Sequence, residues 1–439
     1  MPSVIVVGGG LAGLSAAAAL GSAGFSVDLY ESRGFLGGRA TSFPVSPVDE
    51  SDVIDNCQHV LLRCCVNLLD FYRRLGAERH IRFYREYNFI EPGGRVSTLS
   101  ASRLPAPLHL ASSFLRMKCF GLADKVAIGA GMLSIERERH RKDLDRITMM
   151  EWLREKHQTN NAIERFWRQI LVSAVNEDLE LMAASHGFQV FWLGMLSRPE
   201  AFEMGVPDVP LRELYGESAW TGVGDVRIHT RCAVERIATE SGGVAGVLFG
   251  GQLRTADAYV CAVPFEKVTA IAPGLGIDTS GFQHSPITGI HLWFDRPVTD
   301  LPHAALLDRT LQWMFNKGGG RYVQFVISAS RCLVQLSRPE VVDLALRDGA
   351  EFFPLISQAK LERAQVIKEL RATFSAAPGL DACRPGAVTQ IPGLFLAGDW
   401  TRSGWPATME GAVRSGYLAA EAVTAAAGSP AKFVLPDIA

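Results

Sequence analysis

Residues 4–13 read Val4-Ile5-Val6-Val7-Gly8-Gly9-Gly10-Leu11-Ala12-Gly13, a short apolar run that leads directly into the spacing GxGxxG. Such a run of β-branched residues is typical of a strand that is buried on both faces. In that setting Gly8 allows a tight turn, Gly10 lets the backbone approach a phosphate, and Gly13 lets a helix pack closely on the strand. The stretch therefore predicts the strand, turn and helix that begin a dinucleotide-binding domain.

The residues that follow complete this unit. Small residues over 16–20 continue the helix, Ser26 to Tyr30 form a second strand, and Glu31 follows that strand directly. The helix N-terminus, with Leu11 and Ala12 in its first turn, offers free N–H groups to a pyrophosphate. An acid about 20 residues after the first glycine can accept hydrogen bonds from a ribose 2′-hydroxyl. We therefore expect Glu31 to bind the ribose and to repel a 2′-phosphate.

Two further segments indicate which dinucleotide binds. Gly38 and Arg39, after a second glycine pair, place a cation within reach of the same pyrophosphate, which NAD sites do not need. Near the C-terminus a buried strand ends at Gly398-Asp399, and a helix is expected over 407–426. Asp399 is placed to hold ribitol hydroxyls, and the helix start at Met409 can aim N–H groups at a flavin pyrimidine. The predicted cofactor is FAD, bound non-covalently because no cysteine lies between residues 391 and 416.

The composition excludes several other classes of protein. Lys and Arg number 44 against 46 Asp and Glu, and this net charge of −2 does not suit a nucleic-acid partner. The first 27 residues carry no charged side chain, but they lack the basic start of a signal peptide and are interrupted by glycines. The eight cysteines show neither CxxC spacing nor a nearby His pair, so we expect reduced thiols and no metal site. We therefore expect a cytoplasmic protein.

Together these motifs resemble those of the FAD-dependent amine oxidase and phytoene desaturase superfamily. Within it, several further stretches are similar to the hydroxysqualene dehydroxylase family, and they include Asp55-Asn56-Cys57-Gln58-His59, Arg103-Leu104-Pro105-Ala106-Pro107-Leu108-His109, Ile163-Glu164-Arg165-Phe166-Trp167 and Leu396-Ala397-Gly398-Asp399-Trp400-Thr401. The chain departs from that family's pattern at Cys57, where the family has Gly. It departs again after Asn176, where Glu177-Asp178-Leu179 replaces Thr-Pro-Pro.

The resemblance implies a reaction and its residues. The family replaces the allylic hydroxyl of hydroxysqualene by a hydride from reduced FAD, which yields squalene and water. The family pattern brings Gln58 and His59 to the flavin edge, and His titrates near neutrality, so we expect these two residues to supply the proton. An equal alternative for His59 is a purely structural hydrogen bond. By the same analogy Val234 meets the adenine end of the cofactor.

We expect an α/β fold in which a Rossmann-like FAD-binding domain is interleaved with a mixed α+β substrate-binding domain. The predicted FAD-binding domain comprises residues 1–75, 213–272 and 385–439, and the substrate-binding domain comprises 76–212 and 273–384. Apolar spacing predicts a helix over 61–75, and residues 87–99 read as a hairpin around Pro92-Gly93-Gly94. Residues 226–237 read as one strand.

A long apolar isoprenoid substrate must be taken from a membrane, because burying a C30 chain is worth on the order of 20 kcal/mol. The mostly helical segment 103–142 interleaves apolar residues such as Leu108 and Leu115 with basic residues such as Arg116 and Lys125. Such a segment suits docking on an anionic bilayer, although an ordinary buried helix with a basic end would look similar. We expect peripheral contact with the inner face of the cytoplasmic membrane.

The sequence contains no second strand-GxGxxG-helix unit, so we expect reducing equivalents from an external reductant or a flavin reductase. Three alternatives to a dehydroxylase stay open. A carotenoid-type desaturase or an amine oxidase of the same superfamily would use oxidised flavin. A prenyl-binding escort protein would share the architecture without needing flavin.

Overall fold

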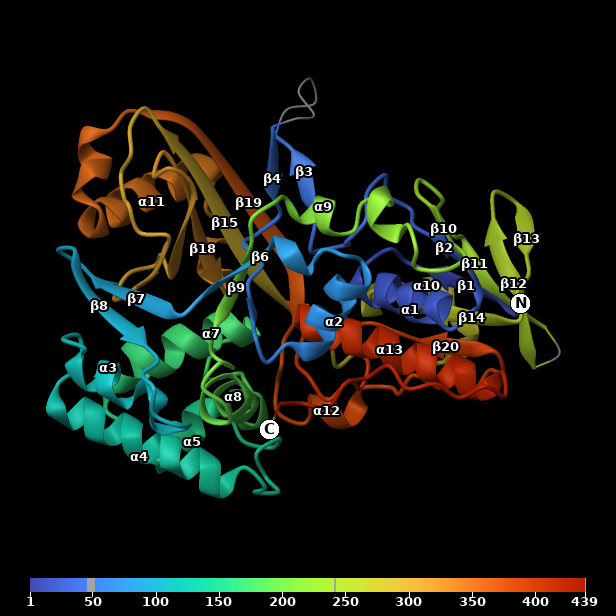
Figure 1. The fold of residues 1–439 in the computed structure, drawn as a ribbon, viewed down its shortest axis with the longest axis horizontal. Coiled ribbons are helices and arrows are strands. Elements are labelled where there is room, and N and C mark those ends of the chain that lie inside the picture. The colour runs from blue at the N-terminus through green and yellow to red at the C-terminus, as the bar shows by residue number, and fades with distance from the viewer. Residues whose placement is uncertain (46–51, 241, 439) are drawn as a thin grey trace.

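The computed structural model describes residues 1–45, 52–240 and 242–438, and it has an α/β fold (Figure 1). A five-stranded sheet has the order β10-β2-β1-β14-β20, and every neighbouring pair is parallel. Its strands are β1 (Ser3–Val7), β2 (Ser26–Tyr30), β10 (Val226–His229), β14 (Ala258–Cys261) and β20 (Leu394–Leu396). Parallel strands bring their carboxyl ends to one edge, where ligands of such sheets bind.

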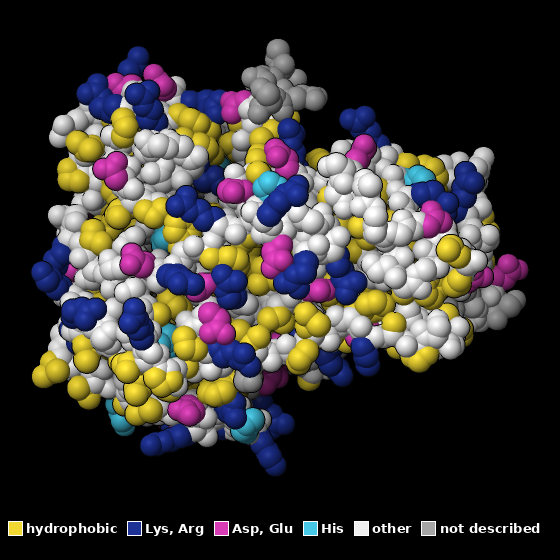
Figure 2. All heavy atoms as spheres, in the orientation of Figure 1, with side chains coloured by type: hydrophobic (Ala, Val, Ile, Leu, Met, Phe, Trp, Pro, Cys, Tyr) yellow, Lys and Arg dark blue, Asp and Glu magenta, His cyan; other side chains and the backbone are white. Residues whose placement is uncertain are grey.

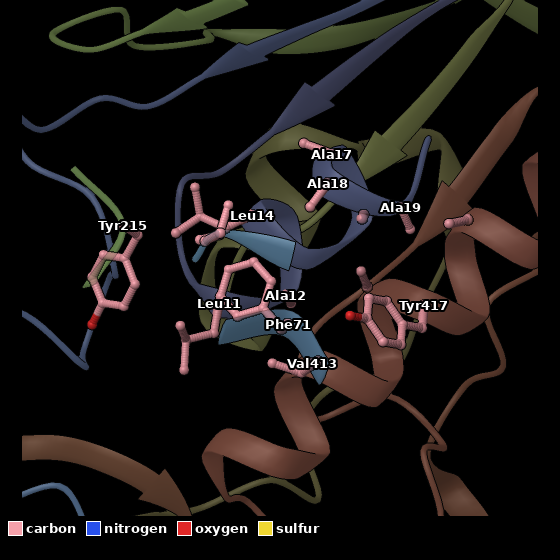
Figure 3. Packing of buried hydrophobic residues seen from close by; sticks show 14 of the residues in the cluster. Leu11, Ala12, Leu14, Ala17, Ala18, Ala19, Phe71, Tyr215, Val413 and Tyr417 are labelled. Atoms are coloured by element: carbon pink, nitrogen blue, oxygen red, sulfur yellow. The ribbon is translucent and has the colours of Figure 1, made fainter. Parts of the chain in front are cut away.

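Two helices with small residues pack closely beside this sheet. They are α1 (Leu11–Ser22) and α13 (Met409–Ala426), and α2 (Val66–Arg74) lies against α13. Figure 3 shows the alanines of α1 beside Phe71 of α2 and Tyr417 of α13. A Cβ at Gly416 would overlap Ser15 of α1, whose hydroxyl donates to the carbonyl of Val413. The small side chains therefore let the two helix backbones approach, which fixes the start of α13 relative to the glycine turn.

The second large sheet has seven strands in the order β19-β15-β18-β17-β16-β7-β8. Its strands are β7 (Glu86–Glu91), β8 (Arg95–Ser100), β15 (His284–Phe294), β16 (His303–Leu306), β17 (Trp313–Gly318), β18 (Tyr322–Ser328) and β19 (Leu361–Phe374). All neighbouring pairs are antiparallel except β16 with β7. Long β15 and β19 run from this sheet toward the parallel one (Figure 1).

Helices cover both sides of the antiparallel sheet. A lower group in Figure 1 comprises α3 (Ala111–Arg116), α4 (Leu122–Glu138), α5 (Met149–Glu155), α7 (Gln169–Val175) and α8 (Ala184–Phe191), while α11 (Arg338–Phe352) lies on the other side. Short α6 (Asn160–Ala162) and the π-helical turns Ile163–Arg168 and Trp192–Leu196 join this lower group. The buried aromatic residues Trp152, Trp167 and Phe191 fill its core. This body therefore has a core of its own.

Shorter elements complete the described chain. The remaining strands are β3 (Ser42–Pro44), β4 (Val53–Asp55), β5 (Leu61–Leu62), β6 (Ile81–Tyr84), β9 (Met204–Pro207), β11 (Arg236–Glu240), β12 (Gly243–Phe249) and β13 (Gln252–Arg254). The remaining α-helices are α9 (Leu211–Leu214), α10 (Phe265–Ile271) and α12 (Leu380–Cys383). Short 3₁₀ turns cover Glu78–His80, Leu108–Leu110, Glu217–Trp220, Pro273–Leu275, Arg331–Leu333 and Pro354–Gln358. The expected class, a Rossmann-like unit interleaved with an α+β part, is confirmed.

All five parallel strands come from the segments 1–75, 213–272 and 385–439, and all seven antiparallel strands come from 76–212 and 273–384. The small sheet β5-β9-β6 crosses the expected boundary at residue 75. The exact domain boundaries therefore stay a prediction. The expected hairpin around Pro92-Gly93-Gly94 is confirmed as β7 and β8.

Two local expectations are wrong. The helix expected over 61–75 begins only at Val66, because Leu61 and Leu62 pair with β9 as strand β5. The single strand expected over 226–237 ends at His229, and the chain then enters a different sheet at Arg236. In both cases a tertiary pairing overrides local periodicity. The segment 103–142 is mostly helical, as expected, with a break between α3 and α4. No helix among the described residues is both long and apolar enough to cross a bilayer.

Candidate functional site

The glycine turn after β1 is held by contacts that leave no room for side chains. Gly8 has φ +114°, and a Cβ there would lie 2.6 Å from the carbonyl oxygen of Ala262. A Cβ at Gly13 would overlap the carbonyl oxygen of Gly8. At Gly10, in contrast, the nearest atom to an added Cβ is Cα of Gly38, at 4.0 Å. The backbone of Gly10 is therefore exposed toward open space beside a second glycine loop.

The second glycine loop is tied directly to the first. The amide of Gly37 donates to the carbonyl of Gly9 at 2.8 Å, and Gly38 has φ +64°. Glu31 at the end of β2 lies in the same place, because its Oε2 accepts from the Gly9 amide at 2.7 Å. Its other carboxylate oxygen accepts from the Arg33 amide at 2.7 Å. The acid predicted to bind the ribose is thus fixed beside the glycine turn.

Arg39 and Asp399 meet across this site. Nη2 of Arg39 lies 2.7 Å from Oδ1 of Asp399, and Nη1 donates to the carbonyl of Ala372 at 2.8 Å. Sequence reasoning assigned the two residues to neighbouring parts of one cofactor but did not predict this ion pair. Buried Arg384 holds the loop after β20, since it donates to the carbonyls of Asp399 and Thr401. These two hydrogen bonds therefore fix the position of the loop at Asp399.

One cavity of about 800 Å³ joins these parts. All the predicted cofactor residues line it except Gly13, which supports the turn from behind, and the lining set is Gly8, Gly10, Leu11, Ala12, Glu31, Gly38, Arg39, Val234, Gly398, Asp399 and Met409. The hydroxyl of Thr408 accepts from the Gly411 amide at 3.0 Å and so caps α13. The start of α13 then presents its positive dipole end toward the cavity.

Much of the rest of the cavity wall is apolar, and charged side chains, among them Glu266, Lys267, Glu369 and Arg371, also line the cavity. Its apolar side chains come from α7, α8, the π-helical turn Trp192–Leu196, β9 and the antiparallel sheet, and they are Tyr87, Phe89, Leu99, Ile170, Val190, Leu193, Met195, Met204, Ile287, Trp313, Phe315 and Val326. Uncharged polar side chains, such as Ser173, Gln189 and Ser328, line it as well. The cavity therefore combines a dinucleotide cradle with a pocket suited to a hydrocarbon.

Gln58 and His59 both line the cavity, as the family pattern led us to expect. Nδ1 of His59 lies 2.9 Å from the carbonyl oxygen of Cys57 and must carry a hydrogen to make that bond. Burial lowers the pKa of His59, so the imidazole is predominantly neutral at pH 7. This finding favours the structural role for His59 over that of a proton source. Gln58 contacts Lys317, whose Nζ lies 2.9 Å from its Oε1.

Cys57, which stands where the resembling family has Gly, is buried in the same loop. Its sulfur lies 3.7 Å from the point where Gly289 of β15 would carry a Cβ. Burial raises the pKa of the Cys57 thiol to about 12, so it is neutral and unreactive at pH 7. The thiol therefore packs beside Gly289 at the edge of the cavity, which it also lines.

The second departure, after Asn176, builds an internal support. Glu177 is fully buried, and its two carboxylate oxygens accept from Arg331 at 2.7 and 2.8 Å. Asn176 itself has φ 59°, lines the cavity, and donates to the carbonyl of Ser285 at 3.0 Å. Glu177 therefore ties the end of α7 to the antiparallel sheet and does not face a substrate.

Sequence reasoning missed Glu410, although it belongs to the quoted helix start. Its carboxylate is fully buried and accepts from the Asn67 amide at 3.2 Å, the Asn67 side chain at 2.8 Å and the Leu68 amide at 2.7 Å. Burial raises the pKa of Glu410 to about 7, against these hydrogen bonds, which lower it. Glu410 caps α2 from α13. This contact could not be predicted from the sequence, because the two helices are far apart along the chain.

The described residues contain no group of three His, Cys, Asp or Glu side chains that could hold a metal ion. The cradle instead fits a flavin dinucleotide, because its glycine backbone leaves space where a Cβ would lie and an acid lies at the ribose position. Non-covalent attachment stays an expectation.

The comparisons with known proteins agree with this geometry. The sequence model of the flavin containing amine oxidoreductase family matches residues 11–424. The zeta-carotene desaturase of Synechocystis is 27% identical, with 96% of this chain and 97% of that protein aligned. The hydroxysqualene dehydroxylase of Sinorhizobium fredii is 28% identical, with 95% of this chain and 97% of that protein aligned.

Solved structures share the fold at lower identity. An oxidoreductase from Methanosarcina mazei superimposes with a TM-score of 0.71 at 17% identity, covering 96% of this chain and all of that one. A putrescine oxidase bound to putrescine gives a TM-score of 0.72 at 15% identity, covering 97% and 99% of the two chains. The cofactor is FAD, and the chain belongs to the flavin containing amine oxidoreductase family.

Proposed function

We propose that this protein is a hydroxysqualene dehydroxylase, which converts hydroxysqualene to squalene. The observation that carries the proposal is the largely apolar wall of the cavity beyond the flavin cradle. Reduced FAD, when bound, supplies the hydride that replaces the allylic hydroxyl. One proton is taken up by the departing hydroxyl group, which leaves as water. The apolar wall binds the hydrocarbon and excludes bulk water from the reacting carbon.

A carotenoid-type desaturase is the second candidate, because carotenoid desaturases match this chain at similar identity. Such an enzyme would use the same apolar wall but would need oxidised FAD. An amine oxidase is disfavoured, because most side chains of the wall are apolar and Glu369 of β19, an acid of the antiparallel sheet that lines the cavity, already accepts from the Asn56 side-chain amide at 3.3 Å. An escort protein without flavin is disfavoured by the family and its intact cradle.

One anaerobic experiment distinguishes these reactions. The purified protein is incubated with dithionite-reduced FAD and hydroxysqualene, and squalene is measured by gas chromatography. Parallel reactions contain oxidised FAD with zeta-carotene or with a primary amine. We expect squalene only, and none from a Gly10→Val variant, whose side chain enters the cradle. Absence of squalene together with turnover of the polyene or the amine would reject the proposal.

The same proposal includes docking on a membrane. On α4 the inward face carries Ile128 and Ile135, which are buried, whereas Leu122, Val126 and Leu133 are 79%, 65% and 51% exposed. These three residues follow helical spacing and share one face. Leu108 and Leu115 nearby are also exposed, and Figure 2 shows apolar side chains gathered over this region. Their exposure supports docking over the alternative of an ordinary buried helix.

The basic residues around this face differ in availability. Arg141 is engaged by Asp143 at 2.6 Å and Glu155 at 2.9 Å, and Arg139 lies over the ring of Trp192. Arg116 and Lys118 line a shallow surface pocket beside β8 instead. We therefore assign attraction to anionic lipid to the exposed residues Arg116, Lys118, Arg137 and Lys142 rather than to Arg139 and Arg141.

Flotation with vesicles tests the docking. We expect salt-sensitive binding to vesicles of anionic phospholipid, and loss of binding in Leu122→Ser/Val126→Ser/Leu133→Ser. Leu253→Ser, at an equally exposed leucine on β13, is the matched control and should bind normally. Wild-type protein that stays in the aqueous fraction at low salt would reject docking.

A docked protein on the inner face of the cytoplasmic membrane would receive electrons from an external reductant or flavin reductase.

A further inference from the structure

The face of the antiparallel sheet that carries the apolar wall changes to polar side chains one row farther along the strands. Val326 pairs with Gly289 on one side and with Trp313 on the other, and both Val326 and Trp313 line the apolar wall. In the next row of the same face, Gln324 pairs with His291, and both are fully buried. The polar end of the sheet therefore lies beneath the loop that carries Cys57 and Gln58.

Lys317 lies at this polar end and reaches that loop. Its Nζ lies 2.9 Å from Oε1 of Gln58 and 3.3 Å from Oδ2 of Asp55. The lysine side chain is 19% exposed and the aspartate side chain 5%. Asp55 is fixed in turn, because its Oδ1 accepts from the Ser42 hydroxyl at 2.7 Å and from the Leu211 amide at 3.0 Å. The ammonium group is thus held by a rigid carboxylate.

This contact determines which way the Gln58 amide faces. An ammonium group only donates hydrogen bonds, so the amide oxygen must point toward Lys317 and the amide nitrogen must point away. Nε2 of Gln58 is buried and has no hydrogen-bond partner among the described residues. Because Gln58 lines the cavity, its NH₂ group is a donor without an acceptor. A buried donor of this kind costs free energy unless a ligand atom accepts from it.

We propose that Lys317 is a positioning residue, which turns the Gln58 amide so that Nε2 donates a hydrogen bond to the hydroxyl oxygen of the substrate. This inference rests on the proposed function and names its specificity element. A hydroxyl oxygen accepts that bond, whereas the product squalene has no oxygen to accept it. The apolar wall binds the hydrocarbon chains of substrate and product equally, so this single donor makes the site prefer hydroxysqualene and release squalene.

The test measures binding and turnover separately. Protein loaded with oxidised FAD is titrated in detergent with hydroxysqualene or squalene, and the change in flavin absorbance reports binding without turnover. We expect wild type to bind hydroxysqualene about tenfold more tightly than squalene. Gln58→Glu keeps the shape and an oxygen facing Lys317 but cannot donate, so this preference should vanish while squalene affinity stays unchanged.

Two lysine variants test the positioning role. Lys317→Met leaves Gln58 in place but frees its amide, so the preference should fall severalfold, with kcat falling more than KM rises. Lys317→Arg also only donates, and it should restore most of the preference. Flavin content and the thermal midpoint show whether each variant is folded. If Gln58→Glu is unfolded, Lys317→Met still tests whether Lys317 positions the Gln58 amide.

The outcomes separate this inference from the proposed function. A wild type that forms squalene, with a preference and kcat that neither Gln58→Glu nor Lys317→Met alters, would overturn the role of Lys317. A wild type that binds hydroxysqualene preferentially but never forms squalene would reject the proposed function and leave the donor supported. Equal affinity of wild type for hydroxysqualene and squalene would overturn the proposed hydrogen bond from Gln58 directly.

Discussion

The two halves of the cavity are built in opposite ways. The dinucleotide half is made of backbone, where glycines at positions 8, 10, 13 and 38 bring main chain within a few ångströms of main chain. The substrate half is made of side chains on a sheet and on helices, such as Trp313, Phe315 and Val326. A backbone site tolerates no added atom, whereas a side-chain wall tolerates exchange of volume. The two halves should therefore differ sharply in their response to mutation.

A pair of glycines, one in each half, gives the largest expected difference. In Gly13→Ala the new Cβ would overlap the carbonyl oxygen of Gly8, so β1 and α1 must separate. We expect a loss of more than about 3 kcal/mol in the free energy of unfolding, together with loss of bound flavin. Urea denaturation and flavin absorbance measure the two effects.

Gly289→Ala is the matched control in the substrate half. The nearest atom to its added Cβ is the carbonyl oxygen of Asn56, at 3.5 Å, which is ordinary contact. We expect a change within about 1 kcal/mol and full flavin content. Equal damage by the two substitutions would contradict the contrast between the halves.

The same contrast explains what could be predicted from the sequence. Residues 4–13 predict their own structure, because strand, turn and helix are local and each glycine has a local function. The capping of α2 by Glu410 and the contact of Lys317 with Gln58 join residues hundreds of positions apart. Side-chain walls also assemble from distant segments. The sequence does not distinguish aromatic residues that line the cavity from those in the core. Only the fold shows that Trp313 lines the cavity and that Phe191 lies in the helical core.

Glu410 joins α13 to α2 within the dinucleotide half and gives the second largest effect. Its pKa rises from an ordinary 4.5 to about 7 in the folded protein. The folded state then binds more protons than the unfolded state between these pH values, so its stability falls as pH rises from about 4.5 to about 7. The difference corresponds to about 3 kcal/mol.

Glu410→Gln removes this titration and keeps a side-chain oxygen that can accept from α2. Urea denaturation of both proteins from pH 4.5 to pH 8 should show wild type losing about 3 kcal/mol relative to the variant, with no further relative loss above pH 8. If the difference in unfolding free energy between the two proteins stayed constant across this range, Glu410 would be ionised throughout. The surroundings of its carboxylate would then be more polar than its burial indicates.

Gly10→Ala sharpens the comparison inside the dinucleotide half. Its added Cβ meets only Cα of Gly38, at 4.0 Å, so the protein without cofactor should keep its stability. The methyl group would project toward the position of the pyrophosphate, and we expect FAD to bind about tenfold more weakly. Fluorescence titration of the stripped protein with FAD measures this. A matching loss of stability without cofactor would mean that Gly10 serves the turn rather than the ligand.

The smallest expected effect lies in the substrate half, at Trp313. Its Nε1 donates to the Ser173 hydroxyl at 2.7 Å, and that hydroxyl donates onward to the Gln169 carbonyl at 2.8 Å. Trp313→Phe leaves Ser173 with its own acceptor, so we expect a loss of only about 1 kcal/mol and unchanged flavin content.

Ser173→Ala removes the same hydrogen bond from the other side and leaves the Trp313 N–H buried without an acceptor. It should therefore cost more than Trp313→Phe, and the double variant should cost less than the sum of the two. Thermal denaturation of the four proteins measures this coupling. Loss of flavin in Trp313→Phe would show that the apolar wall also supports the cradle, and that the two halves are one structural unit rather than two.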